Sequence, residues 1–143
     1  ISKKESEILD LAKNEIKAQI KKEKFLLNTK EAKIILEKKW ELINKVYEKA
    51  LEKLVTMDTK KKEKLFLELL KQCPSEGDII AAENDASILK KLKDGKHILS
   101  KTLPVKGGFV FEGKKERVDN TFENIIVSIR EETEVEVGKI LFG

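Results

Sequence analysis

The sequence predicts an α+β protein in which a long, coiled-coil-forming N-terminal helix precedes a small C-terminal head with an antiparallel sheet flanked by helices. Residues 2–55 contain neither Gly nor Pro, whereas short apolar runs and turn residues alternate from Asp58 onward. Charged residues make up 39% of the chain and aromatic residues 6%, which is too polar for one globule that buries all its helices. We therefore expect a long helix at residues 1–56 and a head at residues 57–143.

The first predicted element is one continuous helix, because its residues are mostly Lys, Glu, Leu, Ile and Ala, which are good or acceptable helix formers. At about 1.5 Å per residue it would reach roughly 80 Å, farther than the core of a small domain extends. Asn28 lies three residues before Glu31 and could instead cap a second helix. A break near Asn28 and Thr29 is therefore the alternative.

Apolar residues recur along this helix at spacings of 7 and 4, which together form an eleven-residue repeat. Such a repeat has about 3.67 residues per turn and predicts a straight or right-handed coiled coil, although the part from Leu36 to Leu54 also fits the heptads of a left-handed one. Both patterns require a second helix, and without it we expect self-association. The predicted partner-helix seam consists of Leu9, Ile16, Ile20, Leu27, Leu36, Trp40, Ile43, Tyr47 and Leu54.

The head is predicted to combine short helices with four strands. Asp58 can cap its first helix, which ends before Pro74. Asn84 or Asp85 can cap a second, short helix. Strands are predicted at residues 78–82, 97–102, 109–112 and 116–119, of which the last two form a hairpin.

The last predicted helix begins after Asn120, which is expected to cap it, with Glu123 as the carboxylate of a capping-box arrangement. Arg117 and Asp119 are expected to fix the hairpin against this helix. Its apolar face is predicted to consist of Phe122, Ile125, Ile126 and Ile129.

Gly108, Gly113 and Lys114 have most of the spacing of a phosphate-binding P-loop. Lys115, however, stands where that motif needs Ser or Thr as a magnesium ligand, and strand-forming residues lie between the glycines. A hairpin turn with solvated lysines is the favoured interpretation. We therefore predict that the chain neither binds ATP tightly nor hydrolyses it.

Other residues that could carry chemistry are isolated or solvated. His97 and Cys73 are the single residues of their types, which excludes an internal disulfide and a thiolate metal cluster. The acidic residues near the C-terminus are interpreted as a solvated helix face. We expect no catalytic residue, no cofactor and no metal. No apolar run approaches the roughly 20 residues that span a bilayer, so any membrane association would be through partners.

The charge of the N-terminal helix suggests a different class of function. Residues 1–64 contain 18 Lys and 12 acidic residues, a net charge of +6. A basic helix of this kind could follow nucleic-acid phosphates. Its lysines are interleaved with acidic residues, however, and it contains no Arg, so we favour the absence of nucleic acid. A nucleic-acid-binding helix and a generic coiled-coil adaptor are the alternatives.

The most specific pattern lies in the C-terminal third, which contains Gly107-Gly108, the run RVDNTFE at Arg117–Glu123 and the ending ILFG at Ile140–Gly143. With these motifs the chain resembles the E subunit of archaeal A-type and vacuolar-type (V/A-type) rotary ATPases, a family with a long N-terminal helix and an α+β head. The resemblance implies a set of family-motif and head-docking residues: Arg117, Asp119, Asn120, Thr121, Phe122, Leu141 and Phe142.

That resemblance also implies a non-catalytic peripheral-stalk component, or stator, of a proton- or sodium-translocating ATPase or ATP synthase. The long helix would pair with a second helical stalk subunit, called H in archaea and G in eukaryotes. The head would contact the B subunit of the catalytic hexamer. The location would be cytoplasmic, peripheral to the cell membrane through the complex. The family's helix is longer than the one here, so we expect an N-terminally truncated chain.

Overall fold

A computed structural model describes residues 3–73, 76–92 and 97–143 of the chain. The described ranges contain, in order, α1, α2, β1, the 3₁₀ turn η1, α3, β2, β3, β4 and α4. This composition confirms the predicted α+β class. The chain divides into two compact units, residues 1–42 and residues 43–143.

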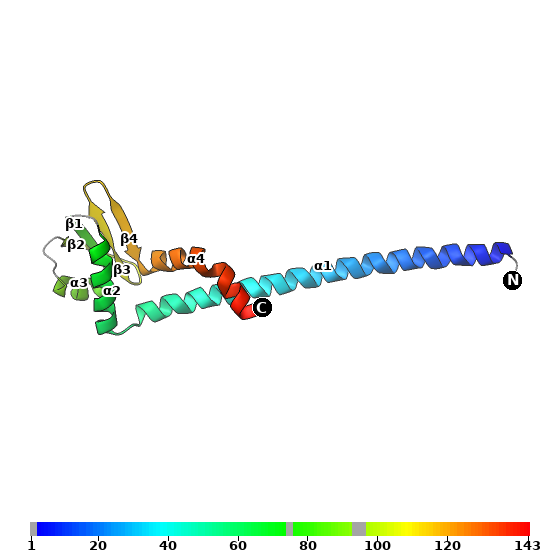
Figure 1. The fold of residues 1–143 in the computed structure, drawn as a ribbon, viewed down its shortest axis with the longest axis horizontal. Coiled ribbons are helices and arrows are strands. Elements are labelled where there is room, and N and C mark those ends of the chain that lie inside the picture. Colours follow the sequence, from blue (N-terminus) through cyan, green and yellow to red (C-terminus); the bar gives the residue numbers. More distant parts are fainter. Residues whose placement is uncertain (1–2, 74–75, 93–96) are drawn as a thin grey trace. The chain divides into compact units, whose positions relative to one another are not determined.

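Helix α1 spans Lys3–Val55 without a break (Figure 1). The alternative of a new helix near Asn28 is wrong, because Thr29 lies inside α1 and its hydroxyl donates a hydrogen bond of 2.8 Å to the carbonyl of Phe25, one turn earlier. No residue that the structure describes between Lys3 and Leu42 is buried. The first unit is thus a helix whose apolar residues are exposed.

The second unit contains the head, whose first helix, α2, spans Thr59–Gln72. Asp58 caps it as predicted, since a carboxylate oxygen accepts a 2.9 Å hydrogen bond from the backbone N–H of Lys61. Cys73 is the buried C-cap residue. Two further helices follow, α3 at Ala86–Lys91 after η1 at Glu83–Asp85, and α4 at Phe122–Phe142.

The four strands of the head form one mixed sheet in the order β2-β1-β3-β4. Their bounds are β1 Gly77–Ala82, β2 His97–Leu103, β3 Gly108–Gly113 and β4 Arg117–Thr121. The pairs β1–β3 and β3–β4 are antiparallel, as predicted for the whole sheet, but β1 and β2 are parallel. The difference arises because α3 lies between these two strands and provides a crossover.

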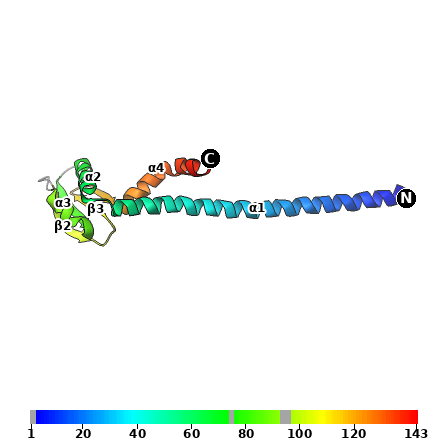
Figure 2. The ribbon, with the colours of Figure 1, turned by 90° about the horizontal axis from the view of Figure 1, so that it is seen from below.

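Four phenylalanines that are fully buried form the centre of the head core: Phe66, Phe109, Phe111 and Phe122. The ring of Phe66 stacks on that of Phe122, with centroids 5.9 Å apart, and meets Phe109 edge-on at 6.1 Å. Figure 2 shows α2 and α3 beside the strands that supply this core. Since Phe122 is the first residue of α4, the beginning of α4 is anchored in the core.

Candidate functional site: the helix seam and the C-terminal motif

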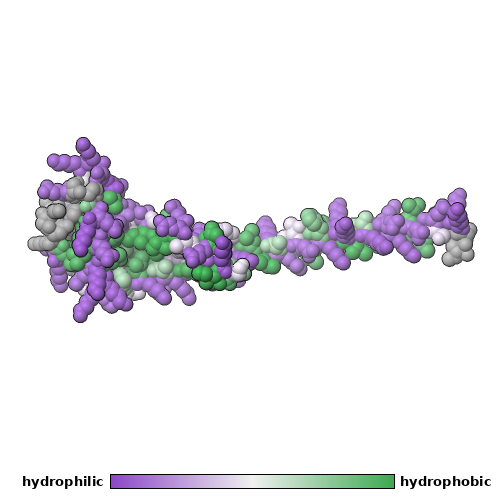
Figure 3. All heavy atoms as spheres, viewed as in Figure 1, coloured by the Kyte–Doolittle hydropathy of each residue, from purple (hydrophilic) through white to green (hydrophobic). Residues whose placement is uncertain are grey.

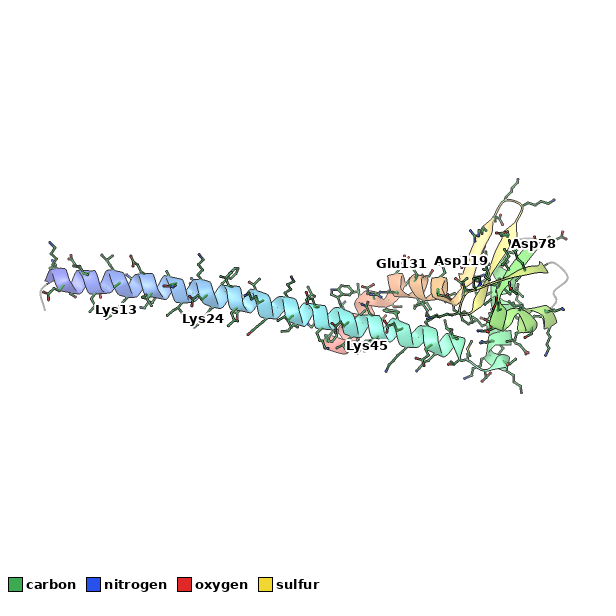
Figure 4. The ribbon with its side chains drawn as sticks, turned by 180° about the vertical axis from the view of Figure 1, so that it is seen from behind. Lys13, Lys24, Lys45, Asp78, Asp119 and Glu131 are labelled. Atoms are coloured by element: carbon green, nitrogen blue, oxygen red, sulfur yellow. The ribbon has the colours of Figure 1, made fainter. Side chains whose placement is uncertain are left out.

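The N-terminal part of the predicted seam is exposed along the first unit. Its six residues have between 44% and 57% of their surface in water: Leu9, Ile16, Ile20, Leu27, Leu36 and Trp40. Figure 3 shows hydrophobic residues interspersed with hydrophilic ones along this helix, and the lysines labelled in Figure 4 project from it. Burial of such a residue contributes about 1.5–3 kcal/mol, so these residues favour a further helix on this segment.

The last three seam residues are instead covered by α4 of the same chain. Ile43 and Tyr47, 7% and 5% exposed, form a buried cluster with Ile126. Half-buried residues of the two helices pack against it: Ala50, Leu51, Leu54, Val137 and Phe142. Ile43, Tyr47 and Leu54, which were predicted to face a partner helix, therefore lie against α4 in this structure. The cluster also explains why the second compact unit begins inside α1.

Polar contacts reinforce the packing of α4 on α1. The hydroxyl of Tyr47 lies 2.8 Å from that of Thr133, which itself donates to the carbonyl of Ile129, so Tyr47 is the donor between the two hydroxyls. Arg130 donates a 2.6 Å hydrogen bond to the side-chain oxygen of Asn44. The same guanidinium lies 5.1 Å from the centre of the Tyr47 ring. The contact is thus specific as well as apolar.

The C-terminal motif forms the junction between β4 and α4, but its capping residue is not the predicted one. Thr121 is the N-cap of α4, and its hydroxyl oxygen accepts a 3.3 Å hydrogen bond from the backbone N–H of Asn124. Asn120 instead belongs to β4, where it pairs with Phe109. Strand β4 extends to Thr121, two residues beyond its predicted end at Asp119, and the helix begins at Phe122, one residue later than predicted.

Asp119 holds the capping residue in place. One of its carboxylate oxygens accepts hydrogen bonds from both the backbone N–H (2.9 Å) and the hydroxyl (2.7 Å) of Thr121. Its backbone carbonyl accepts another, of 2.9 Å, from the side chain of Asn124. The expectation that Asp119 fixes the hairpin to the helix is thus confirmed.

Arg117 and Glu123 differ from their predicted roles. The guanidinium of Arg117 is exposed and lies 3.8 Å from the Glu112 carboxylate on the neighbouring strand β3, rather than against α4. Glu123 does not complete a capping box, because one of its carboxylate oxygens accepts a 3.2 Å hydrogen bond from the backbone N–H of Lys106. Glu123 therefore ties α4 to the loop before β3.

The structure adds a residue that the sequence did not single out as part of the motif, Asp85. It is completely buried; one carboxylate oxygen accepts a 2.9 Å hydrogen bond from the ammonium of Lys62, and the other accepts one of 2.8 Å from the backbone N–H of Gly108. The Lys62 ammonium also lies 5.9 Å from the centre of the Phe122 ring. Asp85 occupies the N-cap position of α3, one of the two predicted possibilities, but its side chain makes no capping hydrogen bond there.

Gly107 and Gly108, which lie beside Asp85 and Phe122, are positions where a side chain would not be accommodated. A Cβ atom on Gly107 would collide with the Phe122 ring, and Gly108 has φ +86°, which side chains disfavour. The carbonyl of Gly107 accepts a 2.9 Å hydrogen bond from the backbone N–H of Phe122. The sequence contains little signal for the role of Asp85, because this residue follows Glu83 and Asn84 in a short polar stretch after β1 that is typical of a solvated turn.

Only part of the predicted motif lies on the surface of the head. Phe122 is fully buried in the head core, and Phe142 is half-buried where it packs against the α1–α4 cluster. Exposed motif residues are Arg117, Asp119 and Leu141. Ile129, predicted on the buried face of α4, is exposed as well.

The P-loop-like spacing lies on a hairpin, as the sequence predicts. Gly108 and Gly113 are the two ends of strand β3, and the backbone N–H of Gly113 donates a 2.8 Å hydrogen bond to Glu116 across the turn. Lys114 and Lys115 are exposed in this turn. A helix N-terminus that could hold a phosphate does not follow the lysines, because β4 does.

Among the described residues, no group of three or more His, Cys, Asp or Glu side chains could hold a metal ion. The acidic residues of α4 include Glu134, which pairs with Arg130 at 3.1 Å, and the exposed Glu131, labelled in Figure 4. The side chain of His97 lies outside the described residues. Within the described part of the chain, no helix is long and apolar enough to cross a membrane.

Comparisons with known proteins agree on one family. The chain is 32% identical to the E subunit of the V-type proton ATPase of Clostridium botulinum (strain Loch Maree), over 88% of this chain and 72% of that protein. It is 29% identical to the E subunit of the A-type ATP synthase of Methanosarcina barkeri, over 81% and 64%. It is 31% identical to the E subunit of the V-type ATP synthase of Clostridium perfringens (strain SM101), over 76% and 62%. No model of a protein family matches the chain.

These relatives and the helix-plus-head architecture define a component of a V-type or A-type ATPase complex. The chain belongs to the E subunit family of these ATPases. It spans less than two thirds of the Methanosarcina and C. perfringens relatives.

Proposed function

We propose that this chain is a non-catalytic peripheral-stalk component, or stator, of a proton- or sodium-translocating ATPase or ATP synthase. Its α1 helix pairs with a second helical stalk subunit, and its head contacts the B subunit of the catalytic hexamer. The protein is cytoplasmic and reaches the membrane only through the complex. The observation that carries the proposal is the exposed row of apolar residues between Leu9 and Trp40.

The physical case begins with the first unit alone. Most helical stability in proteins comes from packing of an apolar face rather than from backbone propensity. Within the described first unit, no apolar side chain is buried. A second helix with a matching apolar row would remove these side chains from water and stiffen α1, which a stator needs in order to resist torque.

The head supplies a rigid attachment in this proposal. The buried Asp85–Lys62 pair and the Phe122 anchor connect α2, β3 and α4 into one core. Arg117, Asp119 and Leu141 lie on its surface and are the motif residues that we propose for contact with the B subunit. No step of chemistry is assigned to the chain. A generic coiled-coil adaptor would use the same helix, but membership of the E subunit family favours the stator.

The test is binding of the full chain to the second stalk subunit of its own ATPase complex, measured by sedimentation. Ile16→Asp places a charge in the apolar row, and we expect it to weaken the pair by about tenfold or more, since burial of an isoleucine contributes about 1.5–3 kcal/mol. Asn14→Asp is the matched control, because a residue two positions away lies about 200° around the helix. It should bind like the unchanged chain.

Two results would contradict the proposal. The first is a chain that stays a helical monomer and does not sediment with the stalk subunit at any concentration tested. The second is equal binding by the Ile16 and Asn14 variants, which would show that the apolar row is not the contact. Co-purification of the chain with the catalytic subunits from native membranes tests the assignment of the head in parallel.

A further inference from the structure

The predicted seam passes from exposed to buried residues between Trp40 and Ile43 of α1, although its heptad spacing continues. Leu36, Trp40, Ile43, Tyr47 and Leu54 share the heptad spacing of a helix partner. Trp40 is 44% exposed, whereas Ile43 and Tyr47 are buried. The spacing is uniform across this change, so the apolar pattern itself does not cause it.

The occupant of the buried part is α4. Apolar side chains of α4 pack against Ile43 and Tyr47, and the Tyr47 hydroxyl is satisfied by Thr133. Arg130 bonds Asn44 and lies over the Tyr47 ring. A helix that replaced α4 would have to supply an acceptor for the part-buried Tyr47 hydroxyl as well as apolar surface for Ile43 and Tyr47.

From these contacts we propose that α4 is a fixed occupant of the C-terminal part of the seam, so that a partner helix covers α1 only as far as Trp40. This inference rests on the proposed stator function. It assigns the C-terminal part of the seam to α4 of the same chain and the N-terminal part to the helix of the second stalk subunit. The external occupant is a helix with an apolar row, and its contact ends where the packing of α4 begins.

The first experiment is hydrogen exchange, followed by mass spectrometry, on the isolated chain and on the ATPase complex from native membranes. We expect peptides within residues 3–42 to become at least tenfold slower to exchange in the complex. Peptides within residues 43–55 should be slow in both samples and change less than twofold. A large gain of protection at 43–55 on assembly would overturn the proposal.

The second experiment loosens α4. Thr133→Val combined with Arg130→Ala removes the polar contacts to α1, and Ser128→Ala, an exposed position on the same helix, is the control. If α4 is the fixed occupant, the affinity for the second stalk subunit should change less than twofold in both variants. Tighter binding by the loosened variant would show that the partner displaces α4. Weaker binding would show that the partner also packs on α4, and either result overturns the proposal.

Failure of this inference can be told apart from failure of the stator function. If residues 3–42 gain no protection in the complex, the partner helix itself is absent and the stator proposal fails. If they gain protection and residues 43–55 do so equally, the stator function stands and the division of the seam is wrong. Faster exchange at 43–55 in the isolated loosened variant would establish that α4 protects this segment.

Discussion

The two segments of α1 have similar sequences but opposite environments. Residues 3–42 and residues 43–55 both alternate Lys and Glu with Leu, Ile and aromatic residues. In the first segment no described residue is buried, whereas the second contributes Ile43 and Tyr47 to a buried cluster. The difference depends on α4, which is distant in sequence. An apolar seam therefore predicts that a helix will be covered, but not by what.

The two compact units also differ in what stabilises them. The second unit has a core of its own, with fully buried rings and a buried ion pair. The first unit has exposed apolar residues whose burial requires another molecule. Substitutions in the head should therefore change unfolding of the isolated chain, while substitutions in residues 3–42 should change association.

The largest effect is expected for Phe122→Ala. Its fully buried ring stacks on Phe66 and fills the space beside Gly107, so its loss leaves a cavity that costs about 3–5 kcal/mol. Denaturant unfolding of the head measures the change. Val127→Ala, at an exposed position on the same helix, is the control and should lie within about 0.5 kcal/mol of the unchanged chain. Equal stability of the two variants would refute the role of Phe122 as an anchor.

A smaller loss is expected for Asp85→Asn. The amide can still accept a hydrogen bond from Gly108, but it no longer neutralises the buried ammonium of Lys62. Loss of a hydrogen bond between charged groups costs about 1.5–3 kcal/mol. Asp78→Asn on the exposed side of β1 is the matched control, and its position is labelled in Figure 4. The same denaturant experiment applies, and an unchanged midpoint for Asp85→Asn would mean that the pair contributes no net stability.

The third effect distinguishes the observed cap from the predicted one. Thr121→Ala removes the side-chain oxygen that accepts from Asn124 and should cost about 1 kcal/mol. Asn120→Ala removes the side chain of a strand residue next to the cap, and its cost in stability should be smaller than that of Thr121→Ala. Thermal unfolding of both variants checks the order. The reverse order would restore Asn120 as the capping residue.

Local features of the head could be predicted from the sequence, because they depend on neighbouring residues. Asp58 caps α2, and Gly113 with its lysines forms the hairpin turn. Thr121 and Asn120 can both cap a helix, and the choice between them depends on how far β4 pairs with β3. The local pattern alone could not decide that.

Features that join distant segments were missed or misplaced. The parallel pairing of β1 with β2 could have been expected, since a helix was predicted between the two strands and such a crossover permits it. Asp85 meets Lys62 and Gly108 only after three segments fold together. The burial of Tyr47 by α4 is likewise a tertiary event, so sequence spacing assigned it to a partner.

The smallest effect on the head is expected for Ile20→Ala in the exposed row. Ile20 is 47% exposed and belongs to the first unit, so unfolding of the head should change by less than about 0.5 kcal/mol. Alanine is also the better helix former, so the helix content of the isolated chain, measured by circular dichroism, should stay equal or rise slightly. Association with the second stalk subunit should nevertheless weaken by about tenfold, because the burial of about two methylene groups is lost, at about 0.8 kcal/mol each, and about 1.4 kcal/mol corresponds to a tenfold change in affinity. A variant that is as stable as the unchanged chain but binds less well would separate folding from assembly within α1. If Ile20→Ala instead lowered the unfolding midpoint of the head as much as Thr121→Ala does, the first unit would contribute to the stability of the head, and the division between the two segments would have to be abandoned.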